Sequence, residues 1–350
     1  MMPFYVDNTQ LSAVQTCEMK AGLRYVLGLT TGEERLELDA GTACHVALAA
    51  WHQGRSKYDA LAEFEKMYRP LTTHVSAEER LSYQNVHRCL DRFFSFYEQN
   101  PMPYTPQKGL VEVVFEAPLD ANGDFQMVGR IDLIAAYKQR LVVFENKTTG
   151  GLNDFWKRRW PMTSQLTTYV FGAQEGYVNG KRLGLPIEEA LVLGIELRKI
   201  PESTRKCPEH KLPYSECGMM HIKWEYSGPH PRPTGFIERW RRDALEAAMK
   251  FKSITEQVHT VQDAADKLQQ NGQFNDSCRY CEFNDSCRQG VPADLMTANL
   301  LKSPWNPHDV KHTELIQLSK THATPSTHQA SLVDVTTGSA PVPSNAKRGE

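Results

Sequence analysis

Two strand-like runs near the middle of the chain place ionisable side chains among apolar ones. They read FQMVGRIDLIAAY (residues 125–137) and RLVVFENKTT (residues 140–149), and they contain Asp132, Glu145 and Lys147. Burial makes each of these charges costly unless an opposite charge or a metal ion neutralises it. A chain with this pattern is therefore expected to fold around a shared polar site.

The two runs predict a β-hairpin whose turn lies between Lys138 and Gln139. Side chains at i and i+2 of a strand share a face, so Glu145 and Lys147 point the same way. In this register Asp132 stands opposite Glu145, with Cβ atoms about 5 Å apart. Two carboxylates at that separation repel unless a cation lies between them, and Mg²⁺ favours such a pair together with water and phosphate oxygens. A structural salt bridge from Lys147 to one acid is the alternative.

The remaining pattern predicts an α/β fold. Helical spacing covers residues 9–29, the stretch from Gly41 onward, and residues 76–100, where Ser76 and Glu79 would form a capping box. Strands expected at residues 110–119, 125–137 and 140–149 would form an antiparallel meander. The later elements expected from the pattern are a helix at 163–178, a strand at 188–197 and two helices within 235–270.

Two regions lack such periodicity. Residues 201–234 contain six prolines and are expected to be an irregular insertion. Residues 301–350, rich in Ser, Thr, Pro and His, are expected to form a disordered tail after a single domain at 1–300.

Composition narrows the class of protein. A chain of 350 residues with 40% hydrophobic content can bury a proper core. We find no signal-peptide pattern and no apolar run near the roughly 18 residues of a membrane-spanning helix, so we expect a cytoplasmic protein. The net charge of -2 argues against indiscriminate binding to polyanions but is compatible with a local basic groove.

The order of these residues resembles the PD-(D/E)XK nuclease superfamily, whose signature is an Asp on one strand and Glu-x-Lys on the next. GRID followed by FENK matches it, although the proline usually written before the Asp is absent. The closer resemblance is to the RecB-like branch, which includes CRISPR-associated and phage-borne exonucleases. That branch adds a histidine in an early helix and Gln-x-x-x-Tyr after the core, and here GTACHVAL supplies His45 and SQLTTYVFG supplies Gln165 and Tyr169.

The resemblance implies a restriction-endonuclease-like core, which is a mixed central sheet flanked by helices, with N-terminal helices and a C-terminal cysteine cluster. The catalytic residues implied in this way are Asp132, Glu145, Lys147, Gln165 and Tyr169. The implied ligands of Mg²⁺ or Mn²⁺ are His45, Asp132 and Glu145. Glu112, in the preceding strand, is either a further acid of the site or a solvated strand residue.

Three cysteines follow in SCRYCEFNDSCRQ, at Cys278, Cys281 and Cys287, one short of a tetrahedral set. The iron-sulfur members of the RecB-like branch take a fourth ligand from an early helix, where this chain has Cys17. The resemblance therefore implies a structural [4Fe–4S] cluster that ties the two ends of the domain together. Zinc bound by the same four thiolates is the rival.

A second group of potential ligands stands in CPEHKLPYSECGMMH, inside the expected insertion. Its members Cys207, His210, Cys217 and His221 are spaced like a small zinc knuckle. Cysteine and histidine also recur by chance in such segments, so unligated loop residues are the default interpretation.

The segment FWKRRWP follows the Glu-x-Lys strand closely. Its cations Lys157, Arg158 and Arg159 suit phosphates, and Trp156 and Trp160 offer flat faces for bases. This combination favours a DNA-binding segment for single strands. A solvated turn whose tryptophans pack inward is the alternative.

The residues and the resemblance together predict a metal-dependent deoxyribonuclease whose partner is DNA. We expect an exonuclease that acts on single-stranded or end-containing DNA in recombination, repair or processing. A free-standing nuclease without a helicase suits a phage or a mobile element. Two alternatives stay open, a non-catalytic DNA-binding or assembly subunit with the same fold and a nuclease that cleaves RNA.

Overall fold

The computed structural model describes residues 2–31, 36–77, 79–198, 206, 211–213, 223–288 and 300–308. Every element below belongs to the unit Met1–Val310, and the unit Lys311–Glu350 lies outside the described residues. The helices are α1 (Asn8–Thr16), α2 (Glu18–Ala21), α3 (Leu36–His52), α4 (Lys57–Tyr68), α5 (Tyr83–Gln99), α6 (Asp154–Arg158), α7 (Ser164–Glu175), α9 (Thr234–Gln257), α10 (Val261–Lys267) and α11 (Asn284–Arg288). The strands are β1 (Phe4–Asp7), β2 (Leu29–Thr30), β3 (Thr105–Pro118), β4 (Phe125–Tyr137), β5 (Arg140–Thr149), β6 (Tyr177–Val178), β7 (Lys181–Arg182), β8 (Glu189–Glu196), β9 (Trp224–Pro231) and β10 (Leu301–Lys302).

The main sheet of the described residues has eight strands. Seven follow the order β7-β6-β3-β4-β5-β8-β9, and β1 pairs with β4. The neighbours β3, β4 and β5 are antiparallel, whereas β5–β8 and β1–β4 are parallel pairs. The predicted meander, the predicted strand at 188–197 and the mixed α/β class with a central mixed sheet are confirmed.

The hairpin of β4 and β5 has the register that the sequence predicts. Its two turn residues have φ angles of 47° and 65°, as a type I′ turn requires, and the ladder ends at the pair Leu133–Phe144. The next pair, Asp132 and Glu145, is not part of the ladder. Instead the Asp132 carboxylate accepts the backbone N–H of Asn146 at 2.7 Å. The two strands therefore separate where the charged residues stand.

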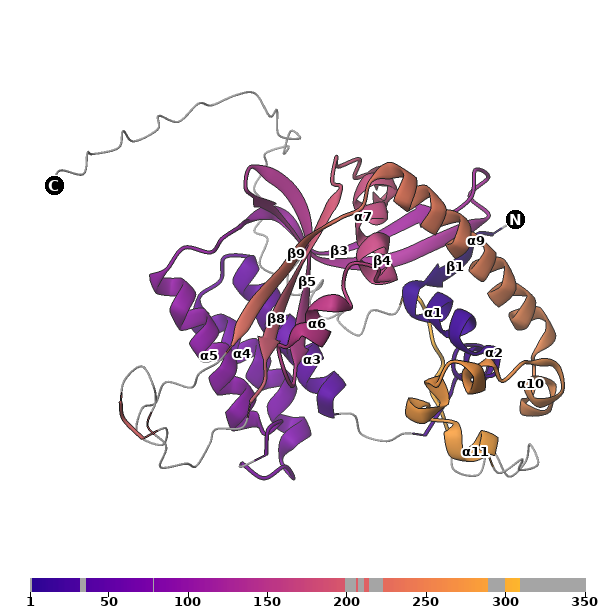
Figure 1. The fold of residues 1–350 in the computed structure, drawn as a ribbon, viewed down its shortest axis with the longest axis horizontal. Coiled ribbons are helices and arrows are strands. Elements are labelled where there is room, and N and C mark those ends of the chain that lie inside the picture. Colours follow the sequence, from indigo (N-terminus) through magenta and orange to yellow (C-terminus); the bar gives the residue numbers. More distant parts are fainter. Residues whose placement is uncertain are drawn as a thin grey trace. The chain divides into compact units, whose positions relative to one another are not determined.

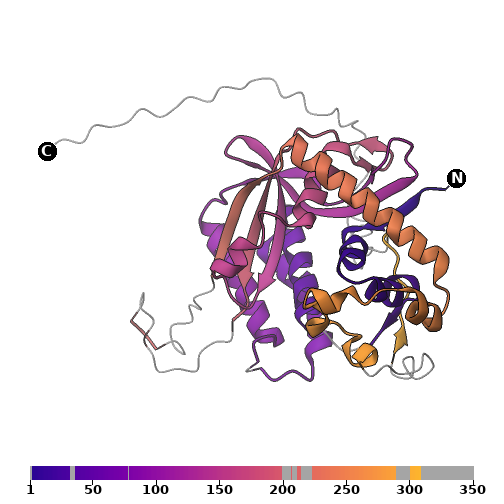
Figure 2. The same ribbon diagram turned by 45° about the vertical axis from the view of Figure 1, so that its right-hand side comes forward.

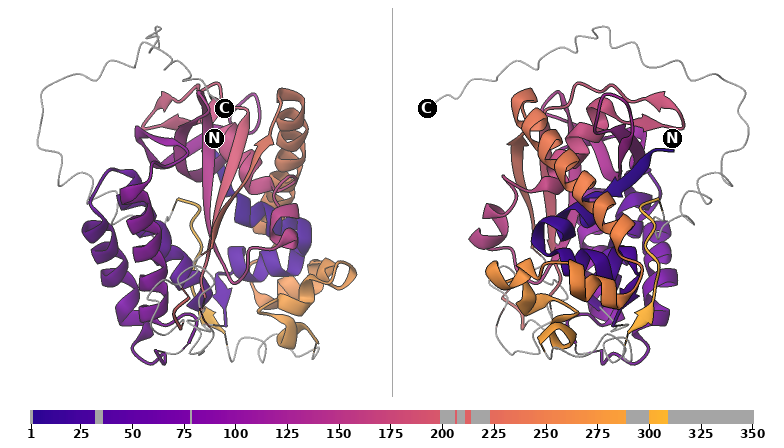
Figure 3. Two further views of the ribbon diagram at one scale, coloured as in Figure 1. Left: turned by 60° about the vertical axis from the view of Figure 1, so that its left-hand side comes forward. Right: turned by 90° about the vertical axis from the view of Figure 1, so that its right-hand side faces the viewer.

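Helices cover both faces of this sheet, and Figure 3 shows the strands between them. On one face α3, α4 and α5 pack with Leu193 of β8, and on the other α6 and α7 pack with Val192. In the parallel ladder Glu145 pairs with Val192 and Lys147 with Gly194, so both charged residues lie on the α6–α7 face. No helix among the described residues is long and apolar enough to cross a membrane.

The last described segments lie beside the N-terminal helices, as Figures 1 and 2 show for α10 and α11 next to α1 and α2. The N–H of Met19 donates to the Gln269 carbonyl oxygen at 3.1 Å, and β10 pairs with β2. The Trp305 indole N–H donates to Asp7 Oδ2 at 2.7 Å. The expected disordered tail therefore does not begin at residue 301, because residues 300–308 join the folded unit; residues 309–350 lie outside the described ones.

Two helix predictions need correction at their N-terminal parts. The first predicted helix is interrupted at Cys17, whose φ of -164° and ψ of 116° are extended, so α1 ends before this residue and α2 begins after it. Helix α3 is described from Leu36, so Gly41 lies inside the helix rather than at its start. Packing of small side chains explains this, because Gly41 faces β5 at close range.

Two further predictions are wrong in part. Helix α5 begins after Ser82, whose hydroxyl accepts the Asn85 N–H, while Glu79 donates to the Ser76 carbonyl in a separate turn. The predicted capping box therefore does not start the helix. The expected irregular insertion at 201–234 contains strand β9, because pairing with β8 overrides the weak strand signal of a proline-rich segment.

Candidate active site

Helix α3 lies close to the sheet because its inner side chains are small. Ala40 and Ala43 are fully buried, and a Cβ added to Gly41 would lie 3.5 Å from Thr148 Oγ1 of β5. This close approach allows the His45 side chain to reach the polar residues of the sheet.

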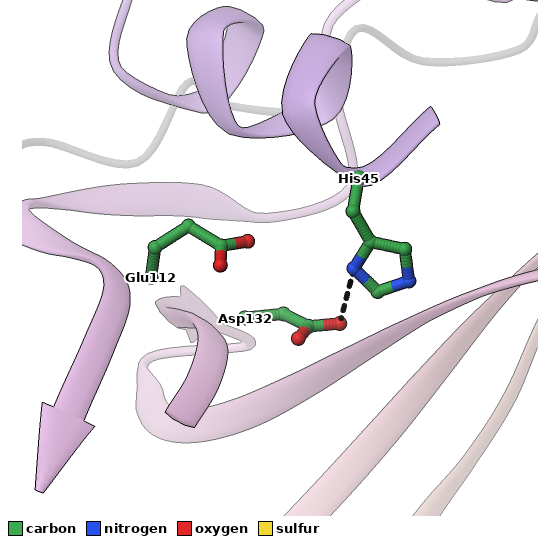
Figure 4. Close-up of side chains that lie close together, drawn as sticks. All are labelled: His45, Glu112 and Asp132. Atoms are coloured by element: carbon green, nitrogen blue, oxygen red, sulfur yellow. Dashed lines mark ion pairs between the residues drawn. The ribbon is translucent and has the colours of Figure 1, made fainter. Parts of the chain in front are cut away.

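His45, Glu112 and Asp132 converge from α3, β3 and β4 (Figure 4). One donor atom of each residue lies within 4.8 Å of the other two, and His45 Nδ1 is 3.4 Å from Asp132 Oδ2. His45 and Asp132, two of the ligands that the resemblance implies, thus lie close together. The third member of the cluster is Glu112 in place of Glu145.

Glu145 is fully buried on the neighbouring strand and forms an ion pair with Lys147. Its Oε2 atom is buried without a hydrogen-bond partner among the described residues, and so is Nδ1 of His45. Such atoms are costly in a metal-free protein, and a divalent cation that accepts oxygen and imidazole ligands would satisfy them. The residues present therefore fit Mg²⁺ or Mn²⁺.

Burial controls protonation in this cluster. Desolvation raises the pKa values of Asp132 and Glu145 above the ordinary carboxyl range and raises the pKa of Glu112 to about 8. The Arg130 guanidinium opposes this rise at Glu112. Desolvation also lowers the pKa of His45 to about 4, so its imidazole is neutral near pH 7 and has a lone pair for a metal.

Arg130 is a cation of this site that the sequence analysis did not single out. Its Nε atom is 2.7 Å from Glu112 Oε2, and it stands two residues before Asp132, on the same face of β4. Glu112 has a φ of 53°, a left-handed conformation that costs about 1–3 kcal/mol in a non-glycine residue and often marks functional sites. The signal was present in GRID, where an arginine precedes the aspartate in an otherwise apolar strand.

Helix α7 presents Gln165 and Tyr169 on one face, and Gln165 Nε2 donates to Tyr169 Oη at 3.1 Å. Burial, and after it the charges of Asp132 and Glu145, raise the pKa of Tyr169 well above its ordinary value. Tyr169 therefore lies beside the carboxylates and keeps its proton, and Gln165 contacts its hydroxyl group.

Lys147 is held in its charged form. Burial lowers its pKa, but Glu145 and then Asp132 outweigh burial, and the net pKa is raised. Arg159 lies near enough to act in the opposite direction. The Lys147 ammonium thus pairs with Glu145 and also lies near Arg159, the residue directly after α6.

The predicted DNA-binding segment forms α6 and the turn after it. The rings of Trp156 and Trp160 lie 5.5 Å apart and are 4% and 1% exposed, so they cannot stack on bases. The predicted role of these tryptophans is therefore wrong, because the apolar core takes up both rings. Lys157, Arg158 and Arg159 are exposed.

The four cysteines of the predicted cluster lie together at the meeting point of the chain ends. The pKa of Cys287 is raised to about 11, first by burial and then by the charges of Cys281, Cys17 and Cys278. A Cβ added to Gly272 would lie 3.0 Å from Cys278 Sγ and 3.5 Å from Cys17 Cβ. The other predicted ligand group falls outside the described residues; its members are Cys207, His210, Cys217 and His221.

A mixed sheet that brings an Asp from one strand and Glu-x-Lys from the next to a buried acidic cluster defines a class of metal-dependent nucleases. A family model described as the PD-(D/E)XK nuclease superfamily matches residues 8–288, and the chain belongs to that superfamily. A solved structure described as "Crystal structure of SSO0001" is similar at 14% identity and a TM-score of 0.29, over 81% of this chain and 96% of that chain. No curated protein matches.

Proposed function

We propose that this protein is a Mg²⁺- or Mn²⁺-dependent exonuclease that acts on single-stranded DNA or on DNA ends. The observation behind the proposal is the charge imbalance of the site. Three carboxylates, the buried Asp132 and Glu145 and the partly buried Glu112, share it with two cations, and the nearby histidine is neutral. A bound divalent cation would remove the excess negative charge, and the superfamily supplies the chemistry for which such a site is used.

His45 and Asp132 would hold the metal, with Glu112 or Glu145 as the third protein ligand. The bound ion would polarise a phosphate oxygen and increase the acidity of a water molecule. Asp132 is held for this role by the N–H of Asn146, which fixes the direction of its carboxylate.

The other side chains would act on the phosphate. The Lys147 ammonium, kept charged by Glu145, would stabilise negative charge as it develops on the phosphate oxygens. Gln165 holds the Tyr169 hydroxyl beside the acids, where it would donate a hydrogen bond to the substrate. Arg130 would hold Glu112 in place.

We further propose that Cys17, Cys278, Cys281 and Cys287 bind a [4Fe–4S] cluster. Burial, and after it the charges of the neighbouring cysteines, raise the pKa values of Cys281 and Cys287, so the four thiols form one group. Zinc bound by the same four thiolates is the rival centre. The cluster would have a structural role, because hydrolysis needs no electron transfer.

The test is digestion of end-labelled linear DNA and of the same DNA as a closed circle, with Mg²⁺, Mn²⁺ or EDTA. An exonuclease degrades the linear form and spares the circle, and EDTA stops the reaction. Cleavage of the circle would instead indicate an endonuclease, and cleavage of labelled RNA alone would change the substrate class. If neither metal supports cleavage of any of these substrates, the protein is a non-catalytic relative.

A further inference from the structure

Helix α6 is fixed to the sheet directly beside the active site. Its Trp156 ring lies over Gly194 of β8, where an added Cβ would overlap the ring. Gly194 is the ladder partner of Lys147, and paired residues of neighbouring strands share a face. The buried side of α6 therefore adjoins Lys147, and Arg159, directly after the helix, lies near enough to Lys147 to lower its pKa.

The segment after α6 is also held firmly. Arg232, only 1% exposed, donates through Nη2 to the Trp160 carbonyl oxygen at 3.2 Å and through Nε to Thr167 Oγ1 at 2.9 Å. It thereby joins the end of the α6 segment to α7, which presents Tyr169 to the acids. This anchoring makes α6 a rigid platform rather than a free loop.

The outer side of α6 combines an exposed aromatic ring with exposed cations. Phe155 is 82% exposed, and Arg158 and Arg159 follow it at i+3 and i+4, the spacing that places side chains on one helical face. Lys157 is paired with Glu225 at 2.6 Å, whereas neither arginine forms an ion pair with another described residue; the Arg159 guanidinium lies over the Trp160 ring, 4.7 Å from its centroid. An exposed phenyl ring beside two guanidinium groups that have no acidic partner matches the chemistry of a base and its neighbouring phosphates.

We propose that Phe155 stacks on an unpaired base of the DNA strand while Arg158 and Arg159 bind its phosphates. We call Phe155, Arg158 and Arg159 together the seat. The seat rests on the proposed function, because it would hold the DNA strand whose phosphodiester lies at Lys147. In a duplex the faces of internal bases are covered by their neighbours, so the seat selects single strands and frayed ends. It also explains how the segment can bind DNA although both of its tryptophans are buried.

The test measures binding in EDTA, so that cleavage plays no part. The probes are a fluorescein-labelled 12-residue oligothymidylate, the same backbone with every base removed, and a closed hairpin duplex. The variants are Phe155→Ala, Phe155→Trp and Arg159→Gln. The matched control is Tyr58→Ala, which removes an aromatic ring that is 76% exposed on α4, on the opposite face of the sheet.

We expect Phe155→Ala to weaken binding of oligothymidylate about tenfold, in keeping with the usual size of base stacking, and to leave the baseless strand and the hairpin within about twofold. Phe155→Trp should restore the affinity, Arg159→Gln should weaken both single strands, and Tyr58→Ala should match the wild type. Because Phe155 is exposed, all variants should melt at the wild-type temperature.

Two results would overturn the seat. One is wild-type affinity of Phe155→Ala for oligothymidylate, and the other is an equal loss on the strand with bases and the strand without them. Either result leaves the nuclease proposal standing, provided that the wild type degrades linear DNA with metal. Conversely, a base-dependent loss in a protein that cleaves nothing would retain the seat and remove the catalytic proposal.

Discussion

At the scale of single residues, the main feature of the site is that it contains more carboxylates than cationic side chains. Asp132 and Glu145 are buried and Glu112 is partly buried; among the described residues, Arg130 pairs with Glu112 and Lys147 with Glu145. Burial raises the pKa values of all three acids, that of Glu112 to about 8. A divalent cation at this site would favour the ionised form of each acid.

The first prediction concerns the acid on β4. Asp132→Asn should abolish Mn²⁺-dependent cleavage and weaken Mn²⁺ binding at least tenfold, while the melting temperature of the metal-free protein stays the same or rises, because a buried charge is removed. Isothermal titration with Mn²⁺ and a nuclease assay check this. Asp124→Asn, an exposed acid at the start of the same hairpin arm, is the control and should behave as the wild type. Normal turnover in Asp132→Asn would remove the residue from the site.

The second prediction separates the role of Lys147 from that of the acids. Lys147→Met should retain Mn²⁺ binding, because the ammonium is not a ligand, yet it should lower turnover by roughly a hundredfold or more. Titration of Mn²⁺ and single-turnover cleavage of linear DNA measure the two effects separately. A loss of metal binding equal to that of Asp132→Asn would contradict this division.

The third prediction concerns pH. The pKa of Glu112 is raised in the folded protein, so its contribution to stability is complete below the ordinary carboxyl value and is lost as pH rises through about 8. The metal-free wild type should therefore melt at a lower temperature at pH 9 than at pH 6, and Glu112→Gln should reduce this difference. Thermal melts in EDTA across this range test it. Equal pH dependence in both proteins would show that Glu112 holds no proton there.

At the scale of helices and strands, two packing features position the site. The small residues of α3 let His45 reach Asp132, and Arg232 connects β9 with the α6 segment and α7. Both features join residues that are distant in sequence. A substitution in one of these elements should therefore change the position of side chains in the active site.

The fourth prediction tests this coupling. Arg232→Met should lower the free energy of unfolding by about 3 kcal/mol, because the acceptors at Thr167 and Trp160 lose their donor inside the core. It should also weaken oligothymidylate binding, because α6 is no longer held against α7. Urea unfolding provides the measurement, and Arg239→Met, at an exposed position of α9, is the control. Unchanged stability would mean that the helices are held by apolar packing alone.

At the scale of the whole described unit, the chain ends are fastened to each other. Residues 269–275 bond to α1 and α2, Arg24 Nη1 donates to the Ser303 carbonyl oxygen at 2.9 Å, and Trp305 bonds to Asp7. The proposed cysteine cluster lies at the same junction. Its loss should open this junction before the sheet is affected.

The fifth prediction concerns that junction. Protein purified without oxygen should contain iron and acid-labile sulfide, and Cys17→Ala should release them as fully as Cys281→Ala does. Both variants should melt at a lower temperature, whereas Cys44→Ala, at a buried cysteine of α3 outside the group, should keep its iron. Metal analysis and melting curves measure this. Stoichiometric zinc in the wild type would replace iron, and retention of metal by Cys17→Ala would exclude that ligand.

The sequence by itself determined the features that follow from local pattern. Alternation along residues 125–149 and a two-residue turn predicted the β4–β5 register, and with it the neighbourhood of Asp132, Glu145 and Lys147. The order of short motifs predicted that His45 and Tyr169 would meet these acids. The register follows from strand geometry, whereas the meeting of His45 and Tyr169 with the acids was implied by the resemblance to the nuclease superfamily.

Only the tertiary structure decided which of these residues face one another and which are buried. Glu112 joins the acidic cluster because its own backbone adopts a left-handed conformation within β3. Trp156 and Trp160 pack into the core, whereas Phe155 is exposed. Pairing with β8 makes a strand of a proline-rich segment. Local periodicity does not predict these burial and pairing outcomes. The free energy of burying a ring or pairing a charge depends on residues that are distant in the chain and become neighbours only in the folded protein.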